Sequence, residues 1–161
     1  MQIVTILGSN AGDKRRLLAE AVRLMGAWGK VVRQSSLYET EPWGFECEER
    51  FLNQVVVFDT TLSPLEFLHR CQETEKQLGR VRPKDGPRYA SRPIDIDLLF
   101  CDALVIENPE LTVPHPRISE RRFVLVPLAE IMPEFVHPVH RKTIAALEKA
   151  CPDRLEVREV E

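Results

Sequence analysis

Apolar and polar residues alternate or recur along the chain in patterns that predict four strands and two helices in the first hundred residues. Strict alternation places every second side chain on one buried face and predicts a strand. Apolar residues at helical spacing predict the helices, and Ser63-Pro64-Leu65-Glu66 forms a capping box before the second one. The predicted strands are 2–7, 30–38, 51–59 and 94–100, and the predicted helices are 14–27 and 64–78.

The order strand, helix, strand, strand, helix, strand is the split β-α-β pattern of the ferredoxin-like fold. We therefore expect an α+β protein in which an antiparallel sheet carries two helices on one face. The C-terminal third extends this core, with a short strand at 104–107, a helix at 143–150 and an edge strand at 155–160. No repeat or linker interrupts the chain, so a single domain over 1–161 is expected.

Composition favours a soluble globular protein, with 43% hydrophobic and 29% charged residues. The first residues lack a basic leader, and no apolar run approaches the ~20 residues of a membrane span. A net charge of −3 argues against general nucleic-acid binding. Scattered cysteines without metal-site spacing predict reduced thiols in a cytoplasmic protein. These cysteines are Cys47, Cys71, Cys101 and Cys151.

The last strand of the predicted core places Asp95 and Asp97 on one face. The opposite face is formed by Ile94, Ile96, Leu98 and Phe100. At ~3.3 Å per residue the two aspartate Cα atoms lie ~6.5 Å apart, so the carboxylates repel each other unless positive charge is nearby. Mg²⁺ meets this need, because it binds one or two carboxylates together with substrate phosphates. The alternative is that both acids pair with arginines on a solvated face.

Two polar loops and one amide add to this picture. The loop 80–92 carries five cations against the single acid Asp85 and leads directly to the two aspartates, which suits a nucleoside triphosphate with its metals. The acidic loop 39–49 holds Trp43 and Phe45, which either fold back on the core or close over a ligand. Asn53 lies in apolar company, so its amide requires a backbone partner or the edge of a heterocycle.

Several motifs in a fixed order carry a resemblance that covers nearly the whole chain. They are Gly8-Ser9-Asn10, Phe51-Leu52-Asn53, Gly79-Arg80-Val81-Arg82, Arg92-x-x-Asp95-x-Asp97-Leu98-Leu99, Leu111-Thr112-Val113-Pro114-His115 and Arg121-Arg122-Phe123-Val124-Leu125. On these motifs the chain resembles the hydroxymethyl-dihydropterin pyrophosphokinase family of the folate pathway. The resemblance implies transfer of pyrophosphate from ATP to the hydroxymethyl group of the pterin, with AMP and the pterin diphosphate as products. It implies two Mg²⁺ ions, and neither a nucleic-acid nor a membrane partner.

The resemblance also implies roles for individual residues. The catalytic residues would be Arg82, Arg92, Asp95 and Asp97, of which the two aspartates bind the metals. The nucleotide would contact Gln72, Glu75, Arg82, Tyr89, Arg92, Ile96, Leu98, His115 and Arg121. The pterin would be held by Thr40, Pro42, Trp43, Phe51, Asn53 and Phe123. The spacing to the acids selects Arg92, although Arg88 is a second candidate for the same role.

Two other functions compete with this interpretation. Another Mg²⁺-dependent nucleotidyl- or phosphotransferase would use the same acids. A ferredoxin-like RNA-binding module would use the basic loop, but the aromatic RNP run of such modules is absent, and Asp95 and Asp97 would repel the RNA backbone.

Overall fold

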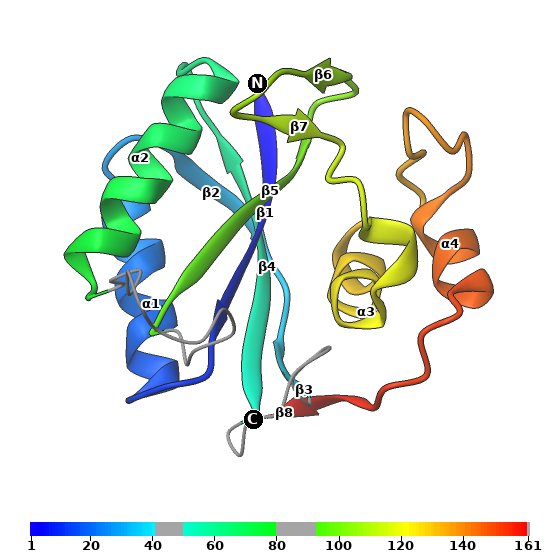
Figure 1. The fold of residues 1–161 in the computed structure, drawn as a ribbon, viewed down its shortest axis with the longest axis horizontal. Coiled ribbons are helices and arrows are strands. Elements are labelled where there is room, and N and C mark those ends of the chain that lie inside the picture. The colour runs from blue at the N-terminus through cyan, green and yellow to red at the C-terminus, as the bar shows by residue number, and fades with distance from the viewer. Residues whose placement is uncertain (41–49, 80–92, 161) are drawn as a thin grey trace.

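The computed structural model describes residues 1–40, 50–79 and 93–160 of the chain (Figure 1). The strands in this part are β1 (Gln2–Ser9), β2 (Lys30–Gln34), β3 (Leu37–Thr40), β4 (Phe51–Asp59), β5 (Asp95–Cys101), β6 (Ile106–Glu107), β7 (Thr112–Val113) and β8 (Val157–Val160). The helices are α1 (Lys14–Met25), α2 (Pro64–Gln77), the short 3-10 helix η1 (Ile118–Glu120), α3 (Arg122–Ile131) and α4 (Ile144–Ala150).

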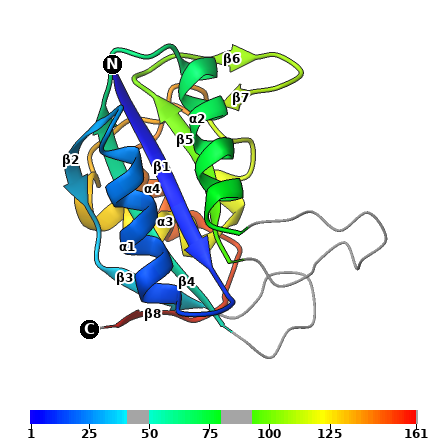
Figure 2. The same ribbon diagram turned by 90° about the vertical axis from the view of Figure 1, so that its left-hand side faces the viewer.

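The main sheet is antiparallel, with the strand order β5-β1-β4-β3-β8 and with β2 also paired to β4. Helices α1 and α2 cover one face, and α3 and α4 lie on the other (Figures 1 and 2). Strands β6 and β7 form a separate two-stranded ribbon. The predicted α+β class with an antiparallel sheet is confirmed.

Each face of the sheet has its own core, because side chains alternate along the strands. On the α1 and α2 face, Leu7 and Phe58 pack with Phe67 of α2. On the α3 and α4 face, Ile6 and Val55 pack with Leu125 of α3. Because both faces carry an apolar core, the strand register decides on which face each polar side chain of the central strands lies.

The helix ends follow the capping signals of the sequence. The Ser63 hydroxyl accepts from the Glu66 backbone N–H, and the Glu66 carboxylate accepts from the Ser63 backbone N–H, so the predicted capping box is confirmed. Asp13 caps α1 and Thr143 caps α4 in the same manner. Helix α2 ends one residue before the predicted boundary.

One predicted strand differs from the structure. The single strand predicted at 30–38 is divided into β2 and β3 at Ser35, whose hydroxyl accepts from the Val55 N–H. Pro127 lies inside α3. That helix tolerates the missing N–H because its apolar face, which includes Leu125 and Leu128, is packed against the sheet.

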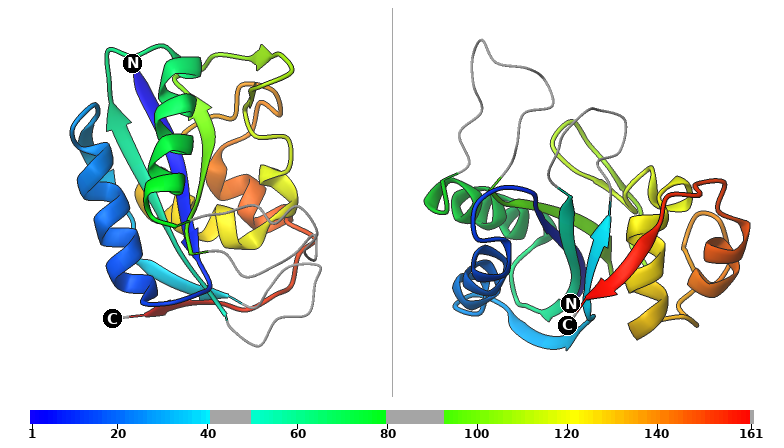
Figure 3. Two further views of the ribbon diagram at one scale, coloured as in Figure 1. Left: turned by 60° about the vertical axis from the view of Figure 1, so that its left-hand side comes forward. Right: turned by 90° about the horizontal axis from the view of Figure 1, so that it is seen from below.

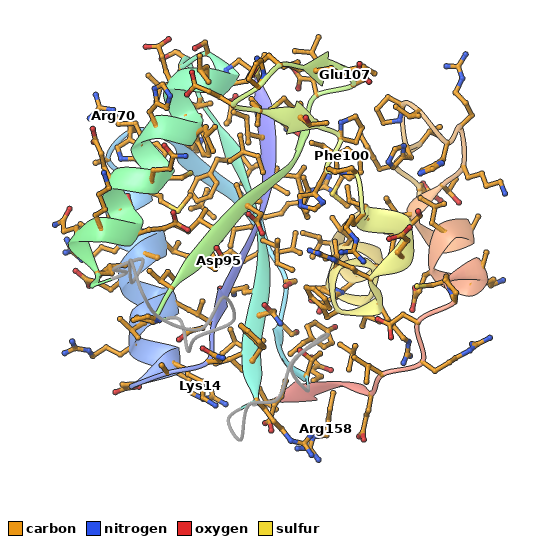
Figure 4. The ribbon with its side chains drawn as sticks, in the orientation of Figure 1. Lys14, Arg70, Asp95, Phe100, Glu107 and Arg158 are labelled. Atoms are coloured by element: carbon orange, nitrogen blue, oxygen red, sulfur yellow. The ribbon has the colours of Figure 1, made fainter. Side chains whose placement is uncertain are left out.

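The face of Phe100 was predicted wrongly. Strict alternation places Phe100 with Ile96, but two successive residues of β1 pair with Phe100 and Leu98, so Leu99 is an extra residue in β5. This β-bulge turns Phe100 to the α3 face, where its ring lies 4.8 Å from that of Phe135 (Figure 4). The bulge follows the two aspartates, so it leaves their common face unchanged.

The structure also describes three of the four cysteines and the lengths of the helices. Cys71, Cys101 and Cys151 are free, as predicted, and they are also buried, whereas Cys47 lies outside the described residues. Within the described part of the chain, every helix is too short or too polar to cross a bilayer.

Candidate active site

The register of the central strands brings the acidic and amide motifs side by side. Gly8 of β1 pairs with Asp95 on β5 and with Asn53 on β4. Directly paired residues of antiparallel strands lie on the same face, roughly 5 Å apart per strand, so Asp95 and Asn53 flank a glycine that has no side chain. Asp97 is the next residue on this face, because side chains alternate along β5. The strand register therefore joins motifs that are more than forty residues apart in the sequence.

Gly8 is needed at this position for space. A Cβ atom on Gly8 would lie only 2.5 Å from the Asn53 Oδ1 atom. Asn53 is buried, and its Nδ2 donates to the Thr40 Oγ1 at 3.3 Å. Among the described residues, the partner of this amide is a buried hydroxyl on the neighbouring strand, whereas the sequence analysis named a backbone partner or a heterocycle edge. Thr40, Asn53 and Gly8 together form one packed polar unit at the end of the sheet.

A cluster of cations, Arg117 and Arg121, lies near the aspartates, whose charges act on Arg121. Arg121 directly precedes α3, and its Nε atom is buried without a hydrogen-bond partner among the described residues. Burial lowers the pKa of Arg121 and Arg117 lowers it further, whereas Asp97 and Asp95 act in the opposite direction. The Arg121 guanidinium also lies 5.7 Å from the centre of the Phe123 ring. Arg121 therefore lies in the field of both acids and beside an aromatic ring.

His115 is held next to this cluster in its neutral form. Its backbone N–H donates to the Leu99 carbonyl at 3.0 Å, and its Nδ1 accepts from the Arg117 N–H at 3.2 Å. Burial is the largest cause that lowers the pKa of His115 to about 4, with further lowering by Arg121 and Arg117 and opposition from Asp95. Because Nδ1 is an acceptor, the neutral ring carries its proton on Nε2 and can donate it in a hydrogen bond.

Arg117 belongs to this electrostatic cluster, but the sequence did not single it out. Its Nε donates to Glu120 at 3.1 Å in η1, and its charge acts on both His115 and Arg121. The signal was present, because Arg117 ends the proline-bounded segment that contains the His115 motif. Only the fold shows that this segment lies beside Arg121.

The residues predicted to bind the nucleotide lie on helix α2 and strand β5. Glu75 is buried, and its Oε2 accepts from the Ile96 N–H at 2.9 Å, which fixes the backbone between the two aspartates. Gln72 is exposed on the same helix. The Ile96 and Leu98 side chains lie in the core of the α1 and α2 face. Any contact of these two residues with a nucleotide must therefore come from their backbone.

The two aromatic side chains predicted to hold the pterin, Phe51 and Phe123, belong to different elements. Phe51 begins β4 and is half-buried, and alternation places it on the same face as Asn53 and Val55. Val55 belongs to the core under α3, so Phe51 shares the face on which α3 lies. Phe123 is half-buried at the start of α3 and packs against that core.

Five predicted site residues lie outside the described residues. They are Arg82, Tyr89 and Arg92 for the nucleotide, and Pro42 and Trp43 for the pterin. The same holds for Arg88, the second candidate for the role of Arg92.

The acids present fit a hard divalent cation. Over the described ranges, no group of three or more His, Cys, Asp or Glu side chains is placed to hold a metal ion. Two carboxylates near arginine side chains leave the remaining ligands to substrate phosphates, which is the usual arrangement for Mg²⁺. The His137 Nδ1 accepts from the Val139 and His140 N–H groups.

The fold and this site fit a transferase that acts on a phosphorylated substrate. Residues 4–133 match the family model described as 7,8-dihydro-6-hydroxymethylpterin-pyrophosphokinase (HPPK), and the chain belongs to this family.

Relatives and solved structures agree with this assignment. A Porphyromonas gingivalis 2-amino-4-hydroxy-6-hydroxymethyldihydropteridine pyrophosphokinase is 42% identical over 134 residues, which cover 82% of this chain and 90% of the relative. The protein of the same name from Methylorubrum extorquens is 42% identical over 154 residues, covering 93% and 96%. A crystal structure of Plasmodium falciparum HPPK-DHPS with pteroate has the same fold, with a TM-score of 0.73 at 19% identity, over 92% of this chain and 42% of that longer one.

Proposed function

We propose a division of roles for the reaction that family membership assigns to this chain. The chain is an ATP-dependent pyrophosphokinase that transfers pyrophosphate from ATP to hydroxymethyl-dihydropterin in folate biosynthesis. Asp95 and Asp97 hold two Mg²⁺ ions. When bound, these ions neutralise phosphate charge and align the triphosphate for transfer.

On the phosphate side, Arg121 and His115 bind the oxygens of the transferred group. The Arg121 guanidinium is always charged and presents several donors, which suits the charge that develops on the phosphates. Neutral His115 donates its Nε2–H without adding a second full charge to the cluster. Arg82 and Arg92 neutralise the same developing phosphate charge. The residues that bind the rest of the nucleotide are Gln72, Glu75, Tyr89, Ile96 and Leu98.

On the acceptor side, the pterin ring lies between Phe51 and Phe123, where a flat heterocycle gains from aromatic faces. Asn53, oriented by Thr40, reads the donor–acceptor edge of the ring, and Pro42 and Trp43 complete the pocket. The Asp95, Gly8 and Asn53 row supports this layout, because it sets the metal ligands next to the edge-reading amide. The hydroxymethyl group then meets the triphosphate above Gly8.

The buried Arg121 Nε is the single observation that carries this assignment. A buried donor without a partner is costly in a protein that has no ligand for it. An anion bound beside Asp95 and Asp97 would give the guanidinium a partner. Because the two acids would repel this anion, a cation must lie between them.

We also propose that residues 1–101 form a ferredoxin-like unit. The order β5-β1-β4, followed by β2 and β3, supports this proposal. We further propose that the protein is cytoplasmic.

Asp97→Asn tests the metal assignment. The variant should lose pyrophosphate transfer to hydroxymethyl-dihydropterin, because an amide cannot balance Mg²⁺. Its apo melting temperature should hold or rise, since one of two adjacent anions is removed. Asp102→Asn is the matched control at the end of the same strand. The Asp102 Oδ1 only accepts from the Gln2 N–H at 2.9 Å, and asparagine preserves this bond, so turnover should be unchanged.

AMP formation and melting temperature are measured on the same samples. A lower apo melting temperature of Asp97→Asn, with turnover retained in the folded fraction, would contradict the metal role and favour an aspartate that is paired for structure.

A further inference from the structure

The C-terminal segment, residues 151–160, connects two walls of the site. It leaves α4, passes the beginning of α3 and ends as β8 against β3 (Figures 1 and 3). The family match ends at residue 133, before this segment begins. Its contacts are specific ones, made by a buried carboxylate at one end and by strand pairing at the other.

Helix α3 begins without a cap of its own. Its N-cap residue, Arg121, makes no side-chain capping hydrogen bond. Asp153 supplies the cap from 31 residues further along the chain, where its Oδ2 accepts from the Arg122 N–H at 2.9 Å. A carboxylate at this place also interacts favourably with the positive end of the helix dipole. Asp153 is 7% exposed, so this bond is shielded from water.

The Asp153 carboxylate is itself fixed in orientation. Its Oδ1 accepts from the Leu155 N–H at 2.9 Å, so each oxygen has one backbone donor. The Arg122 side chain returns the contact, with Nη1 donating to the Leu155 carbonyl at 3.3 Å. The backbone of Arg122 is thus held from two sides, and this is the residue between Arg121 and Phe123.

The other end of the segment holds the opposite wall. β8 pairs antiparallel with β3, with Val157 opposite Thr40. Arg158 reaches Glu39 at 3.6 Å (Figure 4). β3 is therefore an inner strand between β4 and β8, and Thr40 is held where its hydroxyl accepts from Asn53.

We propose that Asp153 is a positioning residue for pyrophosphate transfer. By fixing the Arg122 backbone it sets the positions of the Arg121 guanidinium and the Phe123 ring at the start of α3, without touching either substrate. This inference rests on the site roles proposed above for Arg121 and Phe123. Helical side chains project along directions set by their own backbone, so a shift of the first turn moves both groups together.

Asp153→Ala and Asp153→Asn test the proposal against a purely stabilising cap. Thr143→Ala is the matched control, because the Thr143 Oγ1 caps α4 by accepting from the Ala146 N–H at 3.1 Å, away from the proposed site. All variants are compared with wild type in apo melting temperature, kcat and the KM of each substrate, at a temperature where every sample is folded. Asp153→Ala should lower kcat at least tenfold and raise the pterin KM several-fold. Asp153→Asn, which keeps one acceptor oxygen, should be intermediate, and Thr143→Ala should stay within twofold of wild type.

A double-mutant cycle separates positioning from structure. If Asp153 acts through the first turn of α3, adding Asp153→Ala should lower kcat by a smaller factor in the Arg121→Ala background than in wild type. Multiplicative losses, or a wild-type kcat and KM for Asp153→Ala with a melting temperature lowered as in Thr143→Ala, would overturn the proposal. If Asp153→Ala does not fold, the Asp153→Asn cycle decides by the same criterion. Unchanged turnover in the Arg121→Ala and Phe123→Ala single variants would instead refute the site assignment itself.

Discussion

Gly8→Ala should damage the pterin site through a single methyl group. The added Cβ would lie 2.5 Å from the Asn53 Oδ1, about 0.9 Å short of ordinary contact. Gly8 does not occupy the left-handed region of φ, so alanine is compatible with the backbone and the conflict is one of space alone. The Asn53 amide must therefore move, and it is the group proposed to read the pterin edge.

The size of the effect follows from these contacts. Overpacking a buried site costs about 1–3 kcal/mol of the free energy of unfolding. Moving the amide also strains its 3.3 Å bond to Thr40, because the oxygen and nitrogen belong to one rigid plane. If the displaced amide loses two hydrogen bonds to the pterin at about 1 kcal/mol each, the pterin Kd should rise roughly 30-fold.

Isothermal titration with the pterin and, separately, with Mg²⁺ and an ATP analogue measures both affinities, and a thermal melt measures stability. Gly29→Ala is the matched control. Its Cβ would lie 3.2 Å from the Phe58 ring in the core under α1 and α2, so it should lower the melting temperature while the pterin Kd stays unchanged. A pterin Kd within twofold of wild type for Gly8→Ala, with a lowered melting temperature, would refute the edge-reading role of Asn53.

Two further predictions concern the α3 side of the sheet. Phe123→Ala should raise the pterin Kd at least several-fold, since an aromatic pair contributes ~0.5–1.5 kcal/mol beyond its buried area, and should leave Mg²⁺–ATP affinity nearly intact; equal loss of both ligands would mean that Phe123 is only core. His137 has a pKa of about 4, lowered by burial and then by His140, against 6.5 ordinarily. The unfolded chain therefore takes up a proton that the folded one refuses, and stability should fall as pH drops from 6.5 to 4. His137→Asn keeps an acceptor for the Val139 N–H but does not titrate, so its melting temperature should fall less over that pH window. Parallel curves of melting temperature against pH for this variant and wild type would contradict this.

Local patterns were sufficient for much of the fold. The capping box at Ser63 acts over three residues, and the alternation around Asp95 and Asp97 acts over two, so both can be read without knowing the rest of the chain. The same limit explains the errors. Phe100 changed face because a bulge in the pairing with β1 inserted Leu99, and such a bulge depends on the partner strand.

The candidate site divides along the same line. The sequence by itself determined which residue types are available, because Asp95, Asp97, Asn53 and Phe123 all stand in recognisable motifs. Only the tertiary structure decided their arrangement, since strand register brings Gly8 between an acid and an amide, and through-space charge adds Arg117 to the cluster of cations. Propensity and periodicity are short-range properties, whereas register, burial and electrostatic fields depend on contacts between residues far apart in the chain. The cap that Asp153 provides to α3 belongs to this second kind.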